Sequence, residues 1–370
     1  MNKLARVNLV MIAILVVQVV ILFLLPKEGS SAGPKTEDAG VAGREPFAAL
    51  KAADARAITI TSGEGKVVKL QASTKKEGDK DVTSWVLADR DRFPARTADA
   101  EKIVDAAKKI RLARAITRKE KRYGKLNVAD GVMHAHIQIA GEGGKSLADF
   151  RLGEGSFGNF NVRMEGDPAV YEASGASTWE FPTAVTGLVD SAYLDVPADQ
   201  VVRVKVNAGQ DSYEVEKEIP ESRPASRTES RTDTGPESRA ETRAPETKPE
   251  PRWVTRFDHQ ILDKSKVESW IRGLAKVSLS DPIGKEKKPE YGFDKPTTSV
   301  VLTTADGKET TIVVGAERKE EHDYYLTATG KDFVVTAPSW TVTDQFQKKV
   351  KDLLPGAGGP AEDHTGHDHR

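Results

Sequence analysis

The sequence predicts an α+β protein with an N-terminal transmembrane helix and two tandem repeats of mostly antiparallel sheet with helices. Three observations predict it. A long apolar run lies near the N-terminus, short alternating segments separated by turn residues fill most of the chain, and one set of aromatic and glycine residues occurs twice at the same spacing. A chain of 370 residues has room for two or three domains.

The composition excludes several classes of protein. The chain has 55 basic and 56 acidic residues and a formal net charge of -1, so the basic excess of a nucleic-acid-binding protein is missing. It has no cysteine, which excludes disulfides, thiolate metal sites and cysteine nucleophiles. Hydrophobic residues make up 38% of the chain, which is enough to form cores beneath a highly charged surface.

The N-terminal helix is expected over residues 7–26. Residues 9–25 are apolar except for Gln18, and as a helix they approach the ~30 Å thickness of the hydrocarbon core. A cleaved signal peptide is the alternative, but this run is longer than a usual signal and no A-x-A site follows it. Lys3 and Arg6 place residues 1–6 in the cytoplasm, so we expect a single-pass inner-membrane protein with its bulk in the periplasm.

Beyond a flexible tether over residues 27–46, two repeats are expected over residues 47–196 and 197–355. Their markers are Trp85 and Trp253, then Tyr123-Gly124 and Tyr291-Gly292. In each marker pair the tyrosine is expected to anchor a turn, and the glycine permits a positive φ. Each repeat reads as three strands, a helix, two strand pairs and a final helix.

Each repeat carries one well-marked helix. In the first, Thr97 can cap a helix whose apolar stripe is Ile103, Ala107 and Ile110. In the second, Asp263 can cap a helix with apolar residues at i, i+3, i+4 and i+7. These are Val267, Trp270, Ile271 and Leu274.

Two polar segments are expected to be disordered. Residues 217–252 consist mainly of Glu, Arg, Ser, Thr and Pro, so they cannot bury a core. The repeat alignment places them as an insertion between two strands of the second repeat, where the first has only residues 73–83. Residues 356–370 form a His-rich flexible tail.

Two glycine motifs resemble known sites but lack the required context. Gly153, Gly155 and Gly158 spell G-x-G-x-x-G, yet a strand is expected to follow where a dinucleotide site needs a helix, so we interpret them as a hairpin loop. Residues 29–33 spell G-x-S-x-G, but they belong to the tether and Pro34 ends them, so no nucleophile elbow is expected.

Histidines provide the candidate metal ligands. His134 and His136 are two apart on an expected strand and face the same side, but their counterparts Thr297 and Ser299 are also polar, which favours a solvated face. The tail offers weak candidates for a divalent transition metal; these are His364, His367 and His369. No catalytic residue and no cofactor is predicted.

The sequence resembles a bacterial family known as domain of unknown function 4340. Its pattern is a Trp strand, a helix, a Tyr-Gly turn, strands ending in Leu-Gly, and a tyrosine-containing strand. The first repeat lacks the Asp-x-Pro that follows Tyr-Gly in this pattern. The residues that carry the resemblance are Trp85, Thr97, Tyr123-Gly124, Leu152-Gly153, Asn161-Val162, Trp253, Tyr291-Gly292, Asp294-Lys295-Pro296, Val314-Gly315 and Tyr324-Tyr325. The resemblance implies a membrane-anchored envelope protein encoded beside gliding-type ABC transporter components, with no family catalytic residues.

Three functions therefore remain open. The first is a non-enzymatic accessory or scaffold subunit of an ABC-type transport or gliding-type system, with the membrane and a permease as its partners. The second is an envelope module that binds glycan or another polymer through exposed aromatic residues, such as Trp179, Trp340, Tyr324 and Tyr325. The third is a hydrolase whose site the motifs do not reveal.

Overall fold

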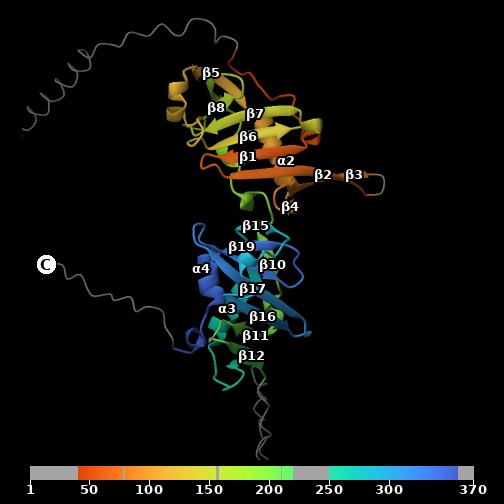
Figure 1. Ribbon diagram of the computed structural model, residues 1–370, viewed down its shortest axis with the longest axis vertical. Coiled ribbons are helices and arrows are strands. Elements are labelled where there is room, and N and C mark those ends of the chain that lie inside the picture. Colours follow the sequence, from red (N-terminus) through yellow and green to blue (C-terminus); the bar gives the residue numbers. More distant parts are fainter. Residues whose placement is uncertain (1–40, 78–79, 156–157, 210, 220–249, 357–370) are drawn as a thin grey trace, which may run out of the picture. The chain divides into compact units, whose positions relative to one another are not determined.

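The computed structural model describes residues 41–77, 80–155, 158–209, 211–219 and 250–356. The chain forms two compact units and contains two large, mostly antiparallel sheets (Figure 1). The predicted anchor at residues 7–26 lies outside the described residues. Within the described part of the chain, no helix is both long enough and apolar enough to cross a bilayer.

The first sheet has nine strands. Its centre is built from strands that alternate buried apolar residues with more exposed ones, as in β1, where Ile58 and Ile60 are fully buried. Across the sheet the strands are β4 (Phe93–Ala95), β3 (Lys80–Leu87), β2 (Val67–Glu77), β1 (Ala57–Ser62), β6 (Ala135–Ala140), β7 (Ser146–Gly153), β8 (Phe160–Met164), β9 (Val170–Ser174) and β5 (Arg111–Thr117).

The second sheet has eight strands in the matching order. Across it the strands are β13 (Arg252–Thr255), β12 (Tyr213–Glu218), β11 (Val201–Asn207), β16 (Thr298–Thr304), β17 (Glu309–Arg318), β18 (Asp323–Ala328), β19 (Val334–Pro338) and β15 (Asp281–Gly284). A separate ribbon pairs β10 (Ala192–Asp195) with β14 (Lys276–Ser278). Each strand of the second sheet therefore has its equivalent in the first, and the predicted repeat of mostly antiparallel sheet is confirmed.

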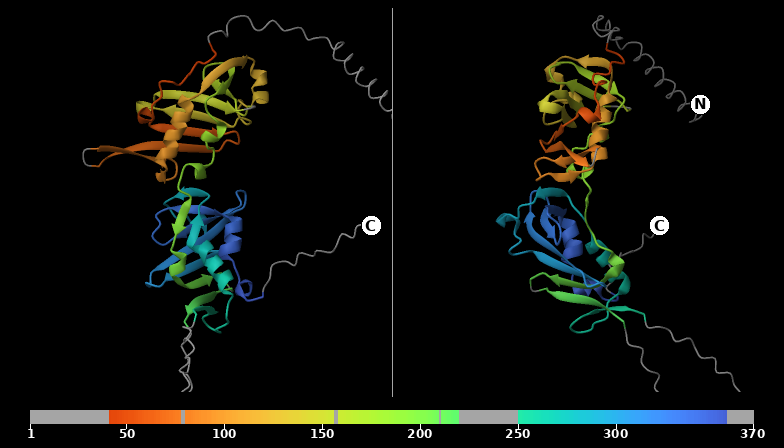
Figure 2. Two further views of the ribbon diagram at one scale, coloured as in Figure 1. Left: turned by 180° about the vertical axis from the view of Figure 1, so that it is seen from behind. Right: turned by 90° about the vertical axis from the view of Figure 1, so that its right-hand side faces the viewer.

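One helix lies against each sheet, as Figure 2 shows for α2 (Thr97–Lys108) and α3 (Lys264–Ala275). The apolar stripes predicted for both helices are buried. The predicted cap is also present, because the Asp263 carboxylate accepts a hydrogen bond from the Lys266 backbone N–H at 3.0 Å. Helix and sheet together enclose the core of each repeat, which includes both marker tryptophans.

Several predicted boundaries require correction. Two edge strands, β5 and β15, follow the helices and were not predicted. Arg111–Thr117 shows no clean alternation of burial, and Asp281–Gly284 is only four residues long and contains a proline. Residues 73–77 and 80–84 pair as a hairpin instead of forming a loop. Their polar composition does not prevent a two-stranded ribbon from forming, because both of its faces can be solvated.

The insertion and the tether are also shorter than predicted, because residues at their ends belong to strands or bridges. Lys217 pairs with Trp253 and Glu218 with Arg252, so both ends of the range 217–252 belong to strands. Residues 220–249 lie outside the described residues. Near the start of the described chain, Arg44 forms a β-bridge with Leu112, so the end of the predicted tether at residues 41–46 is tied to edge strand β5.

The two Tyr-Gly turns differ in backbone conformation. Gly292 has φ 72°, as predicted, whereas Gly124 has no positive φ and the left-handed residue of the first turn is Asn127, at φ 54°. The prediction was therefore wrong for Gly124. The first turn lacks the proline that follows in the second, and it continues through a further 3-10 turn, Gly124–Leu126, before it reverses.

Alanine substitutions at these two glycines should have opposite effects. Gly292→Ala should lower the free energy of unfolding by about 1–2 kcal/mol, because alanine is strained at positive φ. Gly124→Ala should leave it unchanged or raise it by up to about 1 kcal/mol, because a Cβ there would meet no atom within 4 Å. Urea unfolding of both variants checks this difference, and equal destabilisation would contradict it.

Candidate functional site

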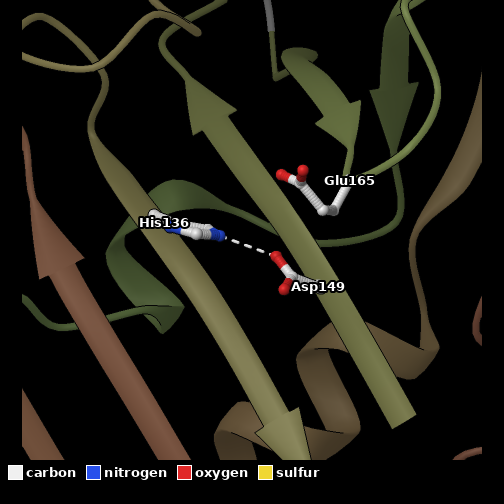
Figure 3. A group of neighbouring side chains, drawn as sticks. All are labelled: His136, Asp149 and Glu165. Atoms are coloured by element: carbon white, nitrogen blue, oxygen red, sulfur yellow. Dashed lines mark hydrogen bonds and ion pairs between the residues drawn. The ribbon is translucent and has the colours of Figure 1, made fainter. Parts of the chain in front are cut away.

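A cluster of ionisable side chains lies on the face of the first sheet that points away from the core. In β6, Ala135, Ile137 and Ile139 are buried, so the intervening His136 and Gln138 point to the opposite face. Asp149 comes from the neighbouring strand β7, and Glu165 follows β8 directly. Three adjacent strands thus bring an imidazole and two carboxylates to one place (Figure 3).

The geometry of this cluster is close. The His136 Nε2 atom lies 2.6 Å from Asp149 Oδ1, and the Gln138 amide donates a hydrogen bond to Asp149 Oδ2 at 2.9 Å. One ligand-type atom from each of His136, Asp149 and Glu165 lies within 4.8 Å of the other two. The His136 and Asp149 side chains are only 16% and 21% exposed, so both are shielded from bulk water.

Arg151 is the cation of this cluster. Its guanidinium donates hydrogen bonds to Asp130 at 2.9 Å and to Glu165 at 2.5 Å, with 13% of the side chain exposed. The hydrogen bond from Arg151 lowers the pKa of the Asp130 carboxyl. Burial alone would lower the pKa of Arg151, but Asp130 and Glu165 raise it instead. The Glu165 carboxylate is therefore held in place by a permanent positive charge.

The histidines predicted as a pair do not act together. His134 lies just before β6 and its Nε2 is 3.3 Å from the Phe181 carbonyl, whereas His136 contacts Asp149. Both are half-buried, and neither lies on a fully solvated face. The carboxylate partners of His136 were missed, since 56 acidic residues leave no sequence signal for them. The tail histidines at 364, 367 and 369 lie outside the described residues.

The G-x-G-x-x-G motif lies between two strands and not between a strand and a helix. Gly153 ends β7 and Phe160 begins β8, so the G-x-G-x-x-G stretch connects two antiparallel strands, as predicted. The G-x-S-x-G at residues 29–33 lies outside the described residues.

A hollow lies beside α3 in the second repeat. Its lining residues are Ala198, Asp199, Val201, Lys217, Trp253, Glu268, Ile271 and Arg272. This lining has no histidine, serine or threonine, so it offers no hydroxyl nucleophile with an imidazole base; its two carboxylates are Asp199 and Glu268. The hollow therefore gives no support to a hydrolase that uses a serine or threonine nucleophile with a histidine base.

An exposed tryptophan follows the last strand of each sheet. Trp179 lies in the 3-10 turn Thr178–Glu180 after β9 and is 78% exposed. Trp340 lies in the short helix α4 (Ser339–Thr341) after β19 and is 68% exposed. In both places the residue two positions later, Phe181 or Val342, is fully buried and anchors the turn. Both repeats therefore present an indole ring to solvent from an anchored turn.

The tyrosines proposed as exposed binding residues are instead half-buried. Tyr325 stacks on Tyr291 with ring centroids 4.2 Å apart, and the Arg318 guanidinium lies 5.6 Å from its ring centroid. Tyr324 is partly covered beside Glu317, and burial raises the pKa of its hydroxyl. Tyr325 was mistaken for a surface residue because its partner Tyr291 is distant in sequence.

Fold and surface together define a twice-repeated α+β protein with open sheet faces and a matched pair of exposed tryptophans. Comparison with family models matches the chain to Domain of unknown function (DUF4340) over residues 85–249 and 253–354, and the chain belongs to this family. Both matched segments begin at a marker tryptophan, Trp85 or Trp253, which agrees with the repeat. The first match starts later than the expected resemblance, which began at residue 47. No curated protein and no solved structure matches the chain.

Proposed function

We propose that this protein is a non-enzymatic accessory subunit of an ABC-type transport or gliding-type system, anchored in the inner membrane by residues 7–26. The apolar N-terminal run supports the anchor, and the positive residues before it favour a periplasmic body. The described hollow beside α3 offers no hydroxyl nucleophile with a histidine base.

The observation that carries the proposal is the pair of exposed tryptophans, Trp179 and Trp340. A single exposed apolar side chain is normal, but here the same exposure recurs in the same place of both repeats. Tryptophan is also the residue type most enriched among those that dominate binding energy in protein interfaces. Each anchored turn offers a partner an indole contact with little loss of conformational entropy.

Mild-detergent purification from native membranes tests the proposal. The tagged wild-type protein should resist extraction by salt and should co-purify with a multispanning permease and an ATP-binding subunit. The double variant Trp179→Ala/Trp340→Ala should retain at least tenfold less of both. Its thermal stability should change little, because both side chains are solvent-exposed.

Phe257→Ala is the matched control. Phe257 is a large aromatic residue that is 84% exposed, but it does not belong to either tryptophan turn. It should retain the transporter subunits at the wild-type level. Equal recovery with the double tryptophan variant would reject these residues as the contact. If that variant instead loses sedimentation with purified cell-wall glycan while the transporter subunits never co-purify, the polymer-binding alternative replaces the proposal.

A further inference from the structure

We propose that His136, Asp149 and Glu165 bind a divalent transition-metal ion, with zinc as the best match to the ligand set. Imidazole nitrogen and carboxylate oxygen are both zinc ligands. The described residues contain no other group of three side chains with ligand atoms this close together. This site is separate from the tryptophan turns of the proposed interaction surface.

The second repeat has the same fold, so its residues at the equivalent positions show whether the fold needs ionisable side chains there. The strand registers place Ser299 at the position of His136 and Thr311 at that of Asp149. The Glu165 N–H donates to the Asp149 carbonyl at 2.9 Å, and the Thr329 N–H donates to the Thr311 carbonyl at 2.8 Å. Thr329 is therefore the equivalent of Glu165, and the backbone is the same at both places.

The second repeat builds this framework without charge. Thr311 and Thr329 are joined by hydrogen bonds between the backbone of one and the hydroxyl of the other, and Ser299 accepts one from Asn207. The sheet therefore does not need ionisable groups at these positions.

Partly buried charges cost desolvation free energy. Arg151 offsets that cost for Asp130 and Glu165. Among the described residues, however, no Arg or Lys pairs with Asp149, and a bound cation would compensate its charge.

The outer contacts resemble those that support metal ligands. The carboxylates of metal sites are commonly held by further hydrogen bonds. Here Gln138 holds Asp149 Oδ2 and Arg151 holds Glu165 Oε2, while Asp149 Oδ1 faces His136 Nε2. A zinc ion would bind between His136 Nε2 and Asp149 Oδ1 and would take the place of their direct contact.

The required movement is small. Zinc lies about 2.0–2.2 Å from nitrogen and oxygen ligands, so its ligand atoms sit roughly 3–3.5 Å apart. The present atoms lie within 4.8 Å of one another, and rotation of the more exposed Glu165 side chain can close the difference. Three protein ligands would leave one position for water.

Zinc titration of the full chain in detergent tests the site. To remove the tail ligands, every variant carries His364→Ala, His367→Ala and His369→Ala. In this background one Zn²⁺ should bind per chain, measured by competition with a chromogenic chelator, and should raise the melting midpoint. The repeat-swap variants His136→Ser and Asp149→Thr should each weaken the affinity at least tenfold.

His134→Ala is the matched control, because His134 is two residues away but contacts only a backbone carbonyl among the described partners. It should bind zinc within twofold of the background. The second repeat folds with serine and threonine at these two positions, so the His136→Ser and Asp149→Thr variants should fold as well. Melting curves recorded without metal check this. Absence of zinc binding in the background, or unchanged affinity in His136→Ser, would overturn the proposal.

Discussion

Gly315→Ala is expected to lower the free energy of unfolding by about 3 kcal/mol, near the upper end for overpacking. A Cβ at this position would overlap the backbone carbonyl of Tyr291. Gly153 is in the equivalent place at the end of β7, and its Cβ would overlap the carbonyls of Leu126 and Asn127. In each repeat the glycine lets the Tyr-Gly turn pack directly on the strand.

The obstacle is backbone, which cannot rotate away as a side chain can. Relief requires the turn to lift from the strand, which would disturb the hydrogen bond from the Thr297 hydroxyl to the Gly315 carbonyl. Urea unfolding of Gly315→Ala and Gly153→Ala should show lower midpoints, with Gly124→Ala as the unstrained control. Unchanged midpoints would show that the turns are not packed in this way.

These two glycines illustrate what sequence reasoning reached and what it missed. The paired motifs Leu152-Gly153 and Val314-Gly315 were recognised as strand ends, because hydrophobic alternation and recurrence mark them. The reason for glycine was not recognised. Glycine in a strand often signals the close approach of another backbone, but only the fold shows that the Tyr-Gly turn is the neighbour.

The candidate metal site could not be predicted from the sequence, for a different reason. His136 was noticed, but its partners depend on the register between β6 and β7, where a shift of one residue would move Asp149 to the other face. That register is set by the turn between the strands, whose geometry is not encoded by periodicity. Similarly, edge strand β5 forms through backbone pairing with β9, so its side chains need not alternate cleanly.

Trp85→Ala and Trp253→Ala are each expected to cost about 3–5 kcal/mol of unfolding free energy, the largest effects that we predict. The two side chains are 2% and 3% exposed and occupy equivalent strands, β3 and β13. Truncation would leave a cavity in the core of each repeat, which the surrounding residues can fill only in part. Trp179→Ala, the same change at a 78% exposed side chain, should stay within about 0.5 kcal/mol.

Phenylalanine distinguishes packing from hydrogen bonding at Trp253. The buried Trp253 Nε1 has no hydrogen-bond partner among the described residues. Trp253→Phe therefore removes an unsatisfied donor while it keeps most of the apolar volume, and it should cost less than half of the loss in Trp253→Ala. Equilibrium unfolding in urea measures all four variants. Equal losses for Trp253→Phe and Trp253→Ala would contradict this prediction. They would mean that the indole N–H stabilises the fold through a hydrogen bond.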